Sequence, residues 1–247
     1  RRGAVAGNPV ILSIQNQRKD LYYGALQNAG IPVPFYLPNP TLPEIMMCLM
    51  EGMLKCPFIY RTADGCNGND MVLVRDASEL AGVISNAKSH GWRSMAVEYI
   101  DTFSGGYFHR WRVYVLDGKI DMSSHVVGRT WKVEPLFDAD AEVIREFRKV
   151  NDAAPLLEEW KSEIARIGEV LNLRLFAVDM VPKANGFVVV DVNPTYLFEL
   201  DACPHLFHPD DMRHRNGHFE RVARFIHSLS SGGVPHGLAC PSTPKPP

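Results

Sequence analysis

Residues 176–194, FAVDMVPKANGFVVVDVNP, decide the fold and hold the most informative polar side chains of the chain. Two apolar runs flank the turn-forming residues 183–186, so the stretch predicts a β-hairpin. Asp191 and Asn193 are two residues apart and therefore project from one face of their strand, and pairing across the turn brings Asp179 near them. Three oxygen ligands on one sheet face suit Mg²⁺. Periodicity alone leaves a second interpretation open, a plain hairpin whose polar residues face solvent.

The rest of the chain mixes predicted helices and strands without a regular βαβ rhythm, which favours the α+β class over a doubly wound sheet. Helical spacing and capping signals predict helices over residues 19–29, 44–54, 77–89, 156–171 and 219–229. Apolar or alternating runs predict strands over residues 8–14, 57–61, 71–74, 95–100, 109–116, 119–127, 175–181 and 187–192.

Composition and charge exclude several classes of protein. The chain is 46% hydrophobic and 22% charged, as is usual for a globular domain. Its net charge of −2 offers no excess of cations for a nucleic acid or an anionic membrane, and no apolar run is long enough to cross a bilayer. Five scattered cysteines without a CxxC pair are typical of a reduced compartment. We therefore expect a cytoplasmic protein with no nucleic-acid or membrane partner.

Several segments ahead of the hairpin occur in a recognisable order. They are Lys19 followed by the segment Gly30-Ile31-Pro32-Val33-Pro34, a strand, glycine loop and strand over residues 57–74, the segment Val97-Glu98-Tyr99-Ile100, and the strand 109–115. With the hairpin, they resemble the ATP-grasp ligases, which include glutathione synthetases, D-alanine–D-alanine ligases and ribosomal-protein glutamate ligases. The likeness spans residues 9–195, and residues 124–137 resemble a narrower group, poorly characterised ATP-grasp proteins attached to helical repeats.

The resemblance implies two α+β subdomains that clasp a nucleotide, and it implies roles for individual residues. The nucleotide-binding positions are Lys19 and Arg61 for the phosphates, Gly65 and Gly68 in the loop over them, and Glu98, Tyr99, Ile100 and Asp101 for the adenosine. The catalytic cations expected at an acyl phosphate are Arg112, Lys132 and Arg129. The ligands implied for Mg²⁺ are Asp179, Asp191 and Asn193, and the 12-residue interval between the two aspartates matches the family pattern.

Two positions depart from that pattern. Arg61 stands where most members have lysine, which preserves the charge but changes the length and geometry of the side chain. Val178 precedes Asp179, where several members have arginine.

Only 18 residues precede Lys19, so we expect the usual N-terminal domain to be short or absent. The expected organisation is an N-terminal segment over residues 1–56, a small subdomain over 57–100, a large subdomain over 101–229 and a flexible tail over 230–247.

The resemblance implies a ligase that uses ATP and Mg²⁺ to join a carboxylate to an amine or another nucleophile through an acyl phosphate, releasing ADP and phosphate. Small-molecule or peptide substrates, and a homodimer or larger multidomain context, fit this expectation. An ATP-grasp kinase and a nucleotide-binding scaffold without catalysis are the alternatives.

The group Cys203, His205, His208, His214 and His218 has spacings that suit zinc, but no CxxC or HExxH anchors it, and we expect histidines facing solvent instead.

Overall fold

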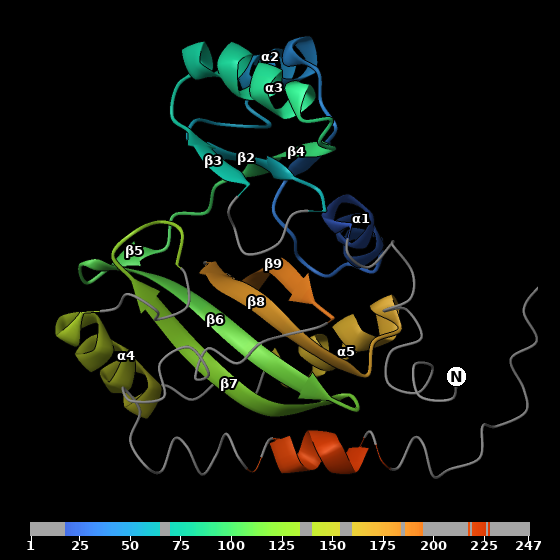
Figure 1. The fold of residues 1–247 in the computed structure, drawn as a ribbon, viewed down its shortest axis with the longest axis vertical. Helices are drawn as coiled ribbons and strands as arrows, with labels where there is room; N and C mark the ends of the chain where they lie inside the picture. Colours follow the sequence, from blue (N-terminus) through green and yellow to red (C-terminus); the bar gives the residue numbers. More distant parts are fainter. Residues whose placement is uncertain are drawn as a thin grey trace, which may run out of the picture.

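The computed structural model describes residues 18–64, 70–133, 140–153, 160–183 and 186–194, together with 217, 219–225 and 227 near the C-terminus. Within these ranges the chain forms two antiparallel sheets, one above the other in the view of Figure 1, with the first helix beside their junction. This mixture of helices and antiparallel sheets is the α+β class that the sequence predicts. No helix in the described ranges is both long enough and apolar enough to span a membrane.

The first sheet has the strand order β1-β4-β2-β3. Its strands are β1 (Tyr36–Pro38), β2 (Phe58–Thr62), β3 (Met71–Val74) and β4 (Ser94–Glu98). Three helical elements belong to this layer: α2 (Leu42–Met50), η3 (Ala77–Glu79) and α3 (Leu80–Ser89). Their apolar faces and the sheet share one core around Ile45, Phe58 and Leu80. Strand β1 and helix α2 come from residues 1–56, the segment expected to precede the small subdomain, and they pack with this sheet. The domain boundary at residue 57 stays a prediction.

Helix α2 begins earlier than the sequence pattern suggests, and its first turn explains why. The Thr41 hydroxyl accepts a hydrogen bond from the Glu44 N–H, while the Glu44 carboxylate accepts one from the Thr41 N–H at 2.7 Å. This reciprocal capping box satisfies two backbone donors that a helix start otherwise leaves unpaired. Pro43 fits the first turn because its missing N–H is not needed there.

The second sheet has the strand order β5-β6-β8-β9, with β7 paired to β6. Its strands are β5 (Phe103–Ser104), β6 (Tyr107–Leu116), β7 (Lys119–Gly128), β8 (Leu175–Lys183) and β9 (Gly186–Asn193). Both predicted hairpins form, β6 with β7 and β8 with β9. The first turns at Asp117 and Gly118, which both have positive φ, the conformation whose twist matches that of the flanking strands.

Two helices accompany this sheet, α4 (Ala141–Ala153) and α5 (Lys161–Leu171). Helix α5 lies within the predicted helix 156–171, whose first residues fall outside the described ranges. Helix α4 was not predicted, although Val143, Phe147 and Val150 pack together at helical spacing beside Val127 of β7. The side chain of Asn151 also fixes α4 to β7, because it accepts from the His125 N–H at 2.8 Å and donates to the His125 carbonyl at 2.9 Å.

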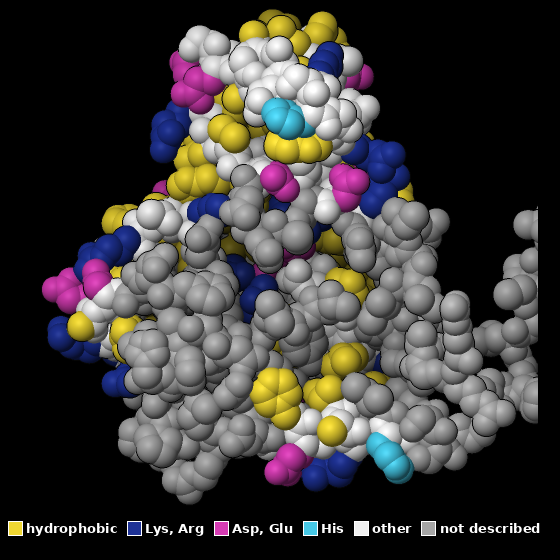
Figure 2. Space-filling model, viewed as in Figure 1, with side chains coloured by type: hydrophobic (Ala, Val, Ile, Leu, Met, Phe, Trp, Pro, Cys, Tyr) yellow, Lys and Arg dark blue, Asp and Glu magenta, His cyan; other side chains and the backbone are white. Residues whose placement is uncertain are grey.

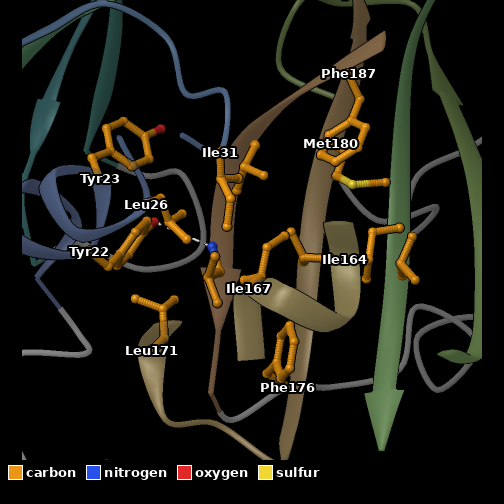
Figure 3. Packing of buried hydrophobic residues seen from close by; sticks show 14 of the residues in the cluster. Tyr22, Tyr23, Leu26, Ile31, Ile164, Ile167, Leu171, Phe176, Met180 and Phe187 are labelled. Carbon is orange, nitrogen blue, oxygen red and sulfur yellow. Dashed lines mark hydrogen bonds between the residues drawn. The ribbon is translucent and has the colours of Figure 1, made fainter. Parts of the chain in front are cut away.

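Helix α1 (Lys19–Asn28) joins the two sheets through an apolar face. Its residues Tyr22, Tyr23 and Leu26 share a core with β4 of the first sheet and with α5, β6, β8 and β9 of the second. In Figure 3, Tyr22 and Leu26 lie beside Ile167 and Leu171 of α5. The helix ends at Asn28, and Gly30 just beyond its cap has a φ of 75°, which suits a residue without Cβ.

The same segment covers the outer edge of the second sheet. Backbone groups of β9 are paired there by Tyr22, Tyr23 and Pro32, in the contacts Val192 N–H to Tyr22 Oη (3.3 Å), Tyr23 Oη to Val190 O (2.7 Å) and Val189 N–H to Pro32 O (2.9 Å). An edge strand otherwise exposes unpaired donors and acceptors. Residues 19–32 therefore fix the position of α1 on β9 by polar contacts as well as by burial.

We predict that Gly168→Ala destabilises the protein by about 2 kcal/mol, the scale of an overpacked core. A Cβ on Gly168 of α5 would lie 2.7 Å from the Leu173 carbonyl oxygen and 2.8 Å from a ring carbon of Phe176. Urea unfolding followed by circular dichroism measures the change. Gly82→Ala in α3 is the matched control, because nothing lies within 4 Å of its added Cβ. Equal stability of Gly168→Ala and the wild type would contradict this packing.

Candidate functional site

The polar residues of the second sheet gather on one of its faces. Arg112 of β6 lies opposite Asp179 of β8, and Asp179 lies opposite Asp191 of β9. Residues directly opposite in an antiparallel pair share a face of the sheet. Asn193, opposite Ala177, is on the same face. The structure therefore brings the three predicted metal ligands together on the face away from the apolar core.

A β-bulge in β9 makes this arrangement possible. From the turn, β8 and β9 pair regularly up to Met180 opposite Val189, but the next pair is Asp179 with Asp191, so Val190 is the extra residue. Without that bulge Asp179 would lie opposite Val190, and Asp191 would project from the other face, because a shift of one residue reverses the orientation of a strand's side chains.

Asp191 is held by hydrogen-bond donors from α1 and from its own strand, and a cation of β2 lies nearby. Its Oδ1 accepts hydrogen bonds from Lys19 Nζ at 2.8 Å, Tyr22 Oη at 2.6 Å and the Val192 N–H at 2.9 Å. Arg61 Nη2 lies 3.9 Å from the Oδ2 atom of Asp191. Burial by itself raises the pKa of Asp191, but the charges of Lys19 and Arg61 outweigh it and hold this pKa well below its usual range. The carboxylate is therefore ionised at neutral pH.

Tyr22 was not identified from the sequence, although it is one helical turn from Lys19 in α1. Burial, and then the negative charge of Asp191, raise the pKa of Tyr22 well above its ordinary value. The hydroxyl consequently stays protonated and remains a donor to Asp191. The available signal was a tyrosine three residues after Lys19, on the same face of the predicted helix.

Backbone contacts bring Lys19 and Arg61 to the same place. The Lys19 N–H donates to the Ala63 carbonyl at 2.8 Å, which attaches the start of α1 to the end of β2. Arg61 is two residues earlier, in β2. Both side chains are buried, with exposed fractions of 5% for Lys19 and 9% for Arg61. Two cations are thus held next to one carboxylate with little access to water.

Asp179 is bound by two arginines of β6. Arg112 donates from Nε to Oδ1 at 2.8 Å and from Nη2 to Oδ2 at 2.9 Å, a bidentate pair. Arg110 Nη1 lies 2.6 Å from Oδ2. Sequence reasoning identified Arg112 but missed Arg110, although it is two residues earlier on the same strand and hence on the same face.

The predicted hinge residues lie at the end of β4 and just after it. The Glu98 N–H donates to the Phe35 carbonyl at 2.8 Å, and the Glu98 carboxylate lies 3.5 Å from Lys183 Nζ of β8. Tyr99 packs edge-on against Trp131 with ring centroids 6.4 Å apart. This contact brings the segment that contains Lys132 next to the hinge.

The remaining predicted site residues are placed as follows. Asp101 accepts hydrogen bonds from the Phe103 N–H at 2.9 Å and from Tyr99 Oη at 3.4 Å. Arg129 binds Asp140 at 3.0 Å and Glu142 at 2.5 Å at the start of α4, where both acidic side chains are exposed. Gly65 and Gly68 of the glycine loop lie outside the described residues, as do the cysteine and histidines considered for zinc.

Two of the buried polar atoms at this site that lack a hydrogen-bond partner among the described residues belong to residues next to Asp191. They are Nε of Arg61 and Nδ2 of Asn193. Leaving such a group unpaired costs about 1–3 kcal/mol, so each fits a position that a ligand fills. The described ranges contain no group of three His, Cys, Asp or Glu side chains arranged for a metal. A cation here would depend on Asp191, the Asn193 amide and oxygens of a bound ligand, a donor set that fits Mg²⁺.

Figure 2 shows how the charged side chains are distributed on one face of the molecule. Lys and Arg side chains occur there near the junction of the two sheets, with Asp and Glu side chains nearby. The four basic residues Lys19, Arg61, Arg110 and Arg112 face the two carboxylates of Asp179 and Asp191. The site has two more positive than negative side chains and is suited to an anionic ligand.

No family model and no curated protein matches this chain. Solved structures do match. D-alanine–D-alanine ligase from Bacillus anthracis superposes with a TM-score of 0.60 at 16% identity, over 93% of this chain and 74% of that one. A RimK domain ATP-grasp protein from Sphaerobacter thermophilus matches with a TM-score of 0.54 at 19% identity, over 92% and 69%.

The ATP-grasp ligase PsnB, solved with a phosphomimetic variant of a minimal precursor, Mg and ADP, matches with a TM-score of 0.51 at 20% identity. This match covers 74% of the present chain and 50% of PsnB, so the chain spans about half the length of that ligase. These likenesses show that the chain has the ATP-grasp fold, as its sequence motifs predict.

We predict that Tyr22→Phe destabilises the protein by about 2 kcal/mol, because it removes a buried hydrogen bond to a charged carboxylate. Chemical denaturation measures the free energy of unfolding. Tyr36→Phe is the matched control: Tyr36 packs edge-on against Tyr23, and loss of its hydroxyl should change stability by less than about 0.5 kcal/mol. Equal effects of the two substitutions would contradict the role of Tyr22 at Asp191.

Proposed function

We propose that this chain, which has the ATP-grasp fold, binds ATP with Mg²⁺ between its two sheets and uses it to join a carboxylate to an amine or another nucleophile. The observation that supports this most is the convergence of Lys19 and Arg61 on Asp191. Lys19 comes from α1, Arg61 from the first sheet and Asp191 from the second. The three residues therefore mark the junction at which a ligand would contact both layers.

The charge balance supports a polyphosphate as that ligand. Buried cations in excess are costly unless an anion neutralises them. A triphosphate carries several negative charges and accepts many hydrogen bonds. It therefore matches the surplus of basic side chains and the Nε atom of Arg61, which has no hydrogen-bond partner among the described residues. Arginine in place of lysine at position 61 preserves the charge and adds the capacity for a bidentate grip on phosphate.

Asp191 and Asn193 are the proposed metal ligands closest to the phosphates. Mg²⁺ held by these residues would neutralise the negative charge that develops on the phosphates. For this, Lys19 exchanges its contact with Asp191 for one with a phosphate. One ammonium on a flexible stem can make this exchange without a change in the backbone. Asp191 thus keeps Lys19 buried and ordered until nucleotide and metal arrive together.

The hinge after β4 would hold the adenine. The Glu98 N–H already donates to Phe35, so the carbonyl of Glu98 and the N–H of Ile100 are the proposed partners of the adenine edge. Asp101, two residues beyond the hinge tyrosine, is the proposed partner of the ribose. Trp131, packed on Tyr99, would limit access of water to this end of the nucleotide.

The proposed reaction proceeds in two steps. A substrate carboxylate attacks the γ-phosphorus of ATP, and the bond between this phosphorus and the β-phosphate oxygen breaks. The products of this step are ADP and an acyl phosphate. The nucleophile then attacks the acyl carbon, loses a proton and expels phosphate. Arg112 and Lys132 are the proposed cations for the charge on the transferred phosphoryl group, and Arg129 is the third candidate, at present engaged by two carboxylates.

We predict that the wild-type chain binds ATP only with Mg²⁺, and that Asp191→Ala combined with Asn193→Ala weakens this binding at least tenfold, about 1.4 kcal/mol. Isothermal titration calorimetry with and without Mg²⁺ measures both effects. Glu163→Ala, which removes an exposed carboxylate from α5, should bind as the wild type does.

Release of ADP and phosphate in a screen of carboxylates and amines would then support the ligase reaction. A stable phosphorylated product formed without an amine would favour an ATP-grasp kinase. Failure of the folded wild-type chain to bind ATP with Mg²⁺ would contradict the proposed function and favour a scaffold without catalysis.

A further inference from the structure

We propose that Asp179 is a positioning residue for Arg110 and Arg112 and that it does not bind the metal, which leaves Asp191 and Asn193 as the protein's ligands for Mg²⁺. This inference rests on the proposed function, because it concerns the same nucleotide site. It separates the roles of two aspartates that face each other across β8 and β9.

The two carboxylates differ first in how their oxygens are used. Both oxygens of Asp179 take part in short contacts with guanidinium groups, at 2.8 and 2.9 Å from Arg112 and 2.6 Å from Arg110. In Asp191, the three short hydrogen bonds all converge on Oδ1. Its Oδ2 faces Arg61 Nη2 at 3.9 Å, which is beyond a direct hydrogen bond. Asp191 therefore presents an oxygen that a metal can take.

The second difference is in burial. The side chain of Asp179 is 5% exposed, whereas that of Asp191 is 22% exposed. A hydrated cation that exchanges water for protein ligands needs a route to the carboxylate, and Mg²⁺ usually keeps several of its waters. Asp191 offers such a route, and Asn193, two residues later on the same face of β9, would add the carbonyl oxygen of its amide as the second ligand.

The third difference is in the cations that would have to move. A guanidinium does not lose its proton in proteins, so Mg²⁺ at Asp179 would lie beside two permanent positive charges. Arg110 and Arg112 are both on β6, the strand paired with β8, so their backbone cannot withdraw without loss of that pairing. Asp191 also has a guanidinium nearby, that of Arg61 at 3.9 Å, but the cation in hydrogen-bond contact with it is Lys19. Lys19 is one ammonium on a flexible stem, and the incoming phosphate offers it a new partner.

The bidentate contact explains what Asp179 does instead. A carboxylate bound through Nε and Nη2 fixes the plane of the Arg112 guanidinium, and the contact with Arg110 aligns a second one beside it. Arg112 lies opposite Asp179 of β8, and Asp179 lies opposite Asp191 of β9, so the two arginines are held on β6, with β8 between them and the strand of the proposed metal ligands. They are thereby preorganised for the terminal phosphoryl group of the nucleotide.

The test compares Asp179→Asn with Asp191→Asn in the full chain. Mn²⁺, which can be counted by electron paramagnetic resonance, replaces Mg²⁺, and the affinities for ATP and ADP are measured in parallel. We expect Asp191→Asn to weaken Mn²⁺ binding in the ternary complex at least tenfold. Asp179→Asn should leave Mn²⁺ affinity within threefold of the wild type but reduce the preference for ATP over ADP at least fivefold, because the arginines lose their orientation.

A loss of Mn²⁺ in Asp179→Asn equal to that in Asp191→Asn would overturn the inference and make both aspartates ligands. If the wild type binds neither Mn²⁺ nor ATP, the proposed function itself fails. This result is distinguishable from failure of the inference on Asp179, in which the wild type binds both ligands. Glu163→Gln on α5 is the matched control for removal of one carboxylate charge and should change neither quantity.

Arg112→Lys provides a second test if Asp179→Asn does not fold, which circular dichroism decides. Lysine keeps the positive charge but cannot make the bidentate contact. A positioning role predicts a lower preference for ATP over ADP with Mn²⁺ affinity unchanged. If Asp179 were a ligand, loosening its competing arginine would strengthen Mn²⁺ binding, and that result would overturn the inference.

Discussion

The ion pair between Lys19 and Asp191 is the interaction on which the architecture of the site depends. It joins the start of α1 to β9, and the backbone of Lys19 is bound in turn to the end of β2 in the other sheet. The apolar face of α1 fills the core between the same elements, so burial and charge fix one geometry. A buried ammonium needs a partner, and Asp191 supplies it in the absence of phosphate.

The composition of the site was largely predictable, but its geometry was not. Spacing and resemblance identify Asp179, Asp191 and Asn193, and the structure places all three on one sheet face. The bulge at Val190 places Asp191 and Asn193 on the same face as Asp179. A run of three valines does not indicate where such a bulge falls, because its position depends on how β9 pairs with β8. Arg110 was missed although it shares a face with Arg112, since no partner was visible before β6 and β8 were paired.

The fold shows the same division between local and distant information. Alternating and turn-forming residues correctly predict the hairpins β6–β7 and β8–β9, because those signals are local. Strand β1 has only three residues and exists through pairing with β4, more than fifty residues later, which no local pattern reveals. The apolar residues of helix α4 have helical spacing, but many charged residues separate them, so the helix was not predicted. In the structure these apolar residues pack against Val127 of β7.

The proposed nucleotide and metal site is the place where Lys19 contacts Asp191. Its most direct test is a crystal structure with a non-hydrolysable ATP analogue and Mn²⁺, in which anomalous scattering locates the metal. We expect Mn²⁺ coordinated by Asp191 and Asn193, with Lys19 Nζ moved onto a phosphate oxygen. A nucleotide bound elsewhere, with the Lys19–Asp191 pair intact, would contradict it.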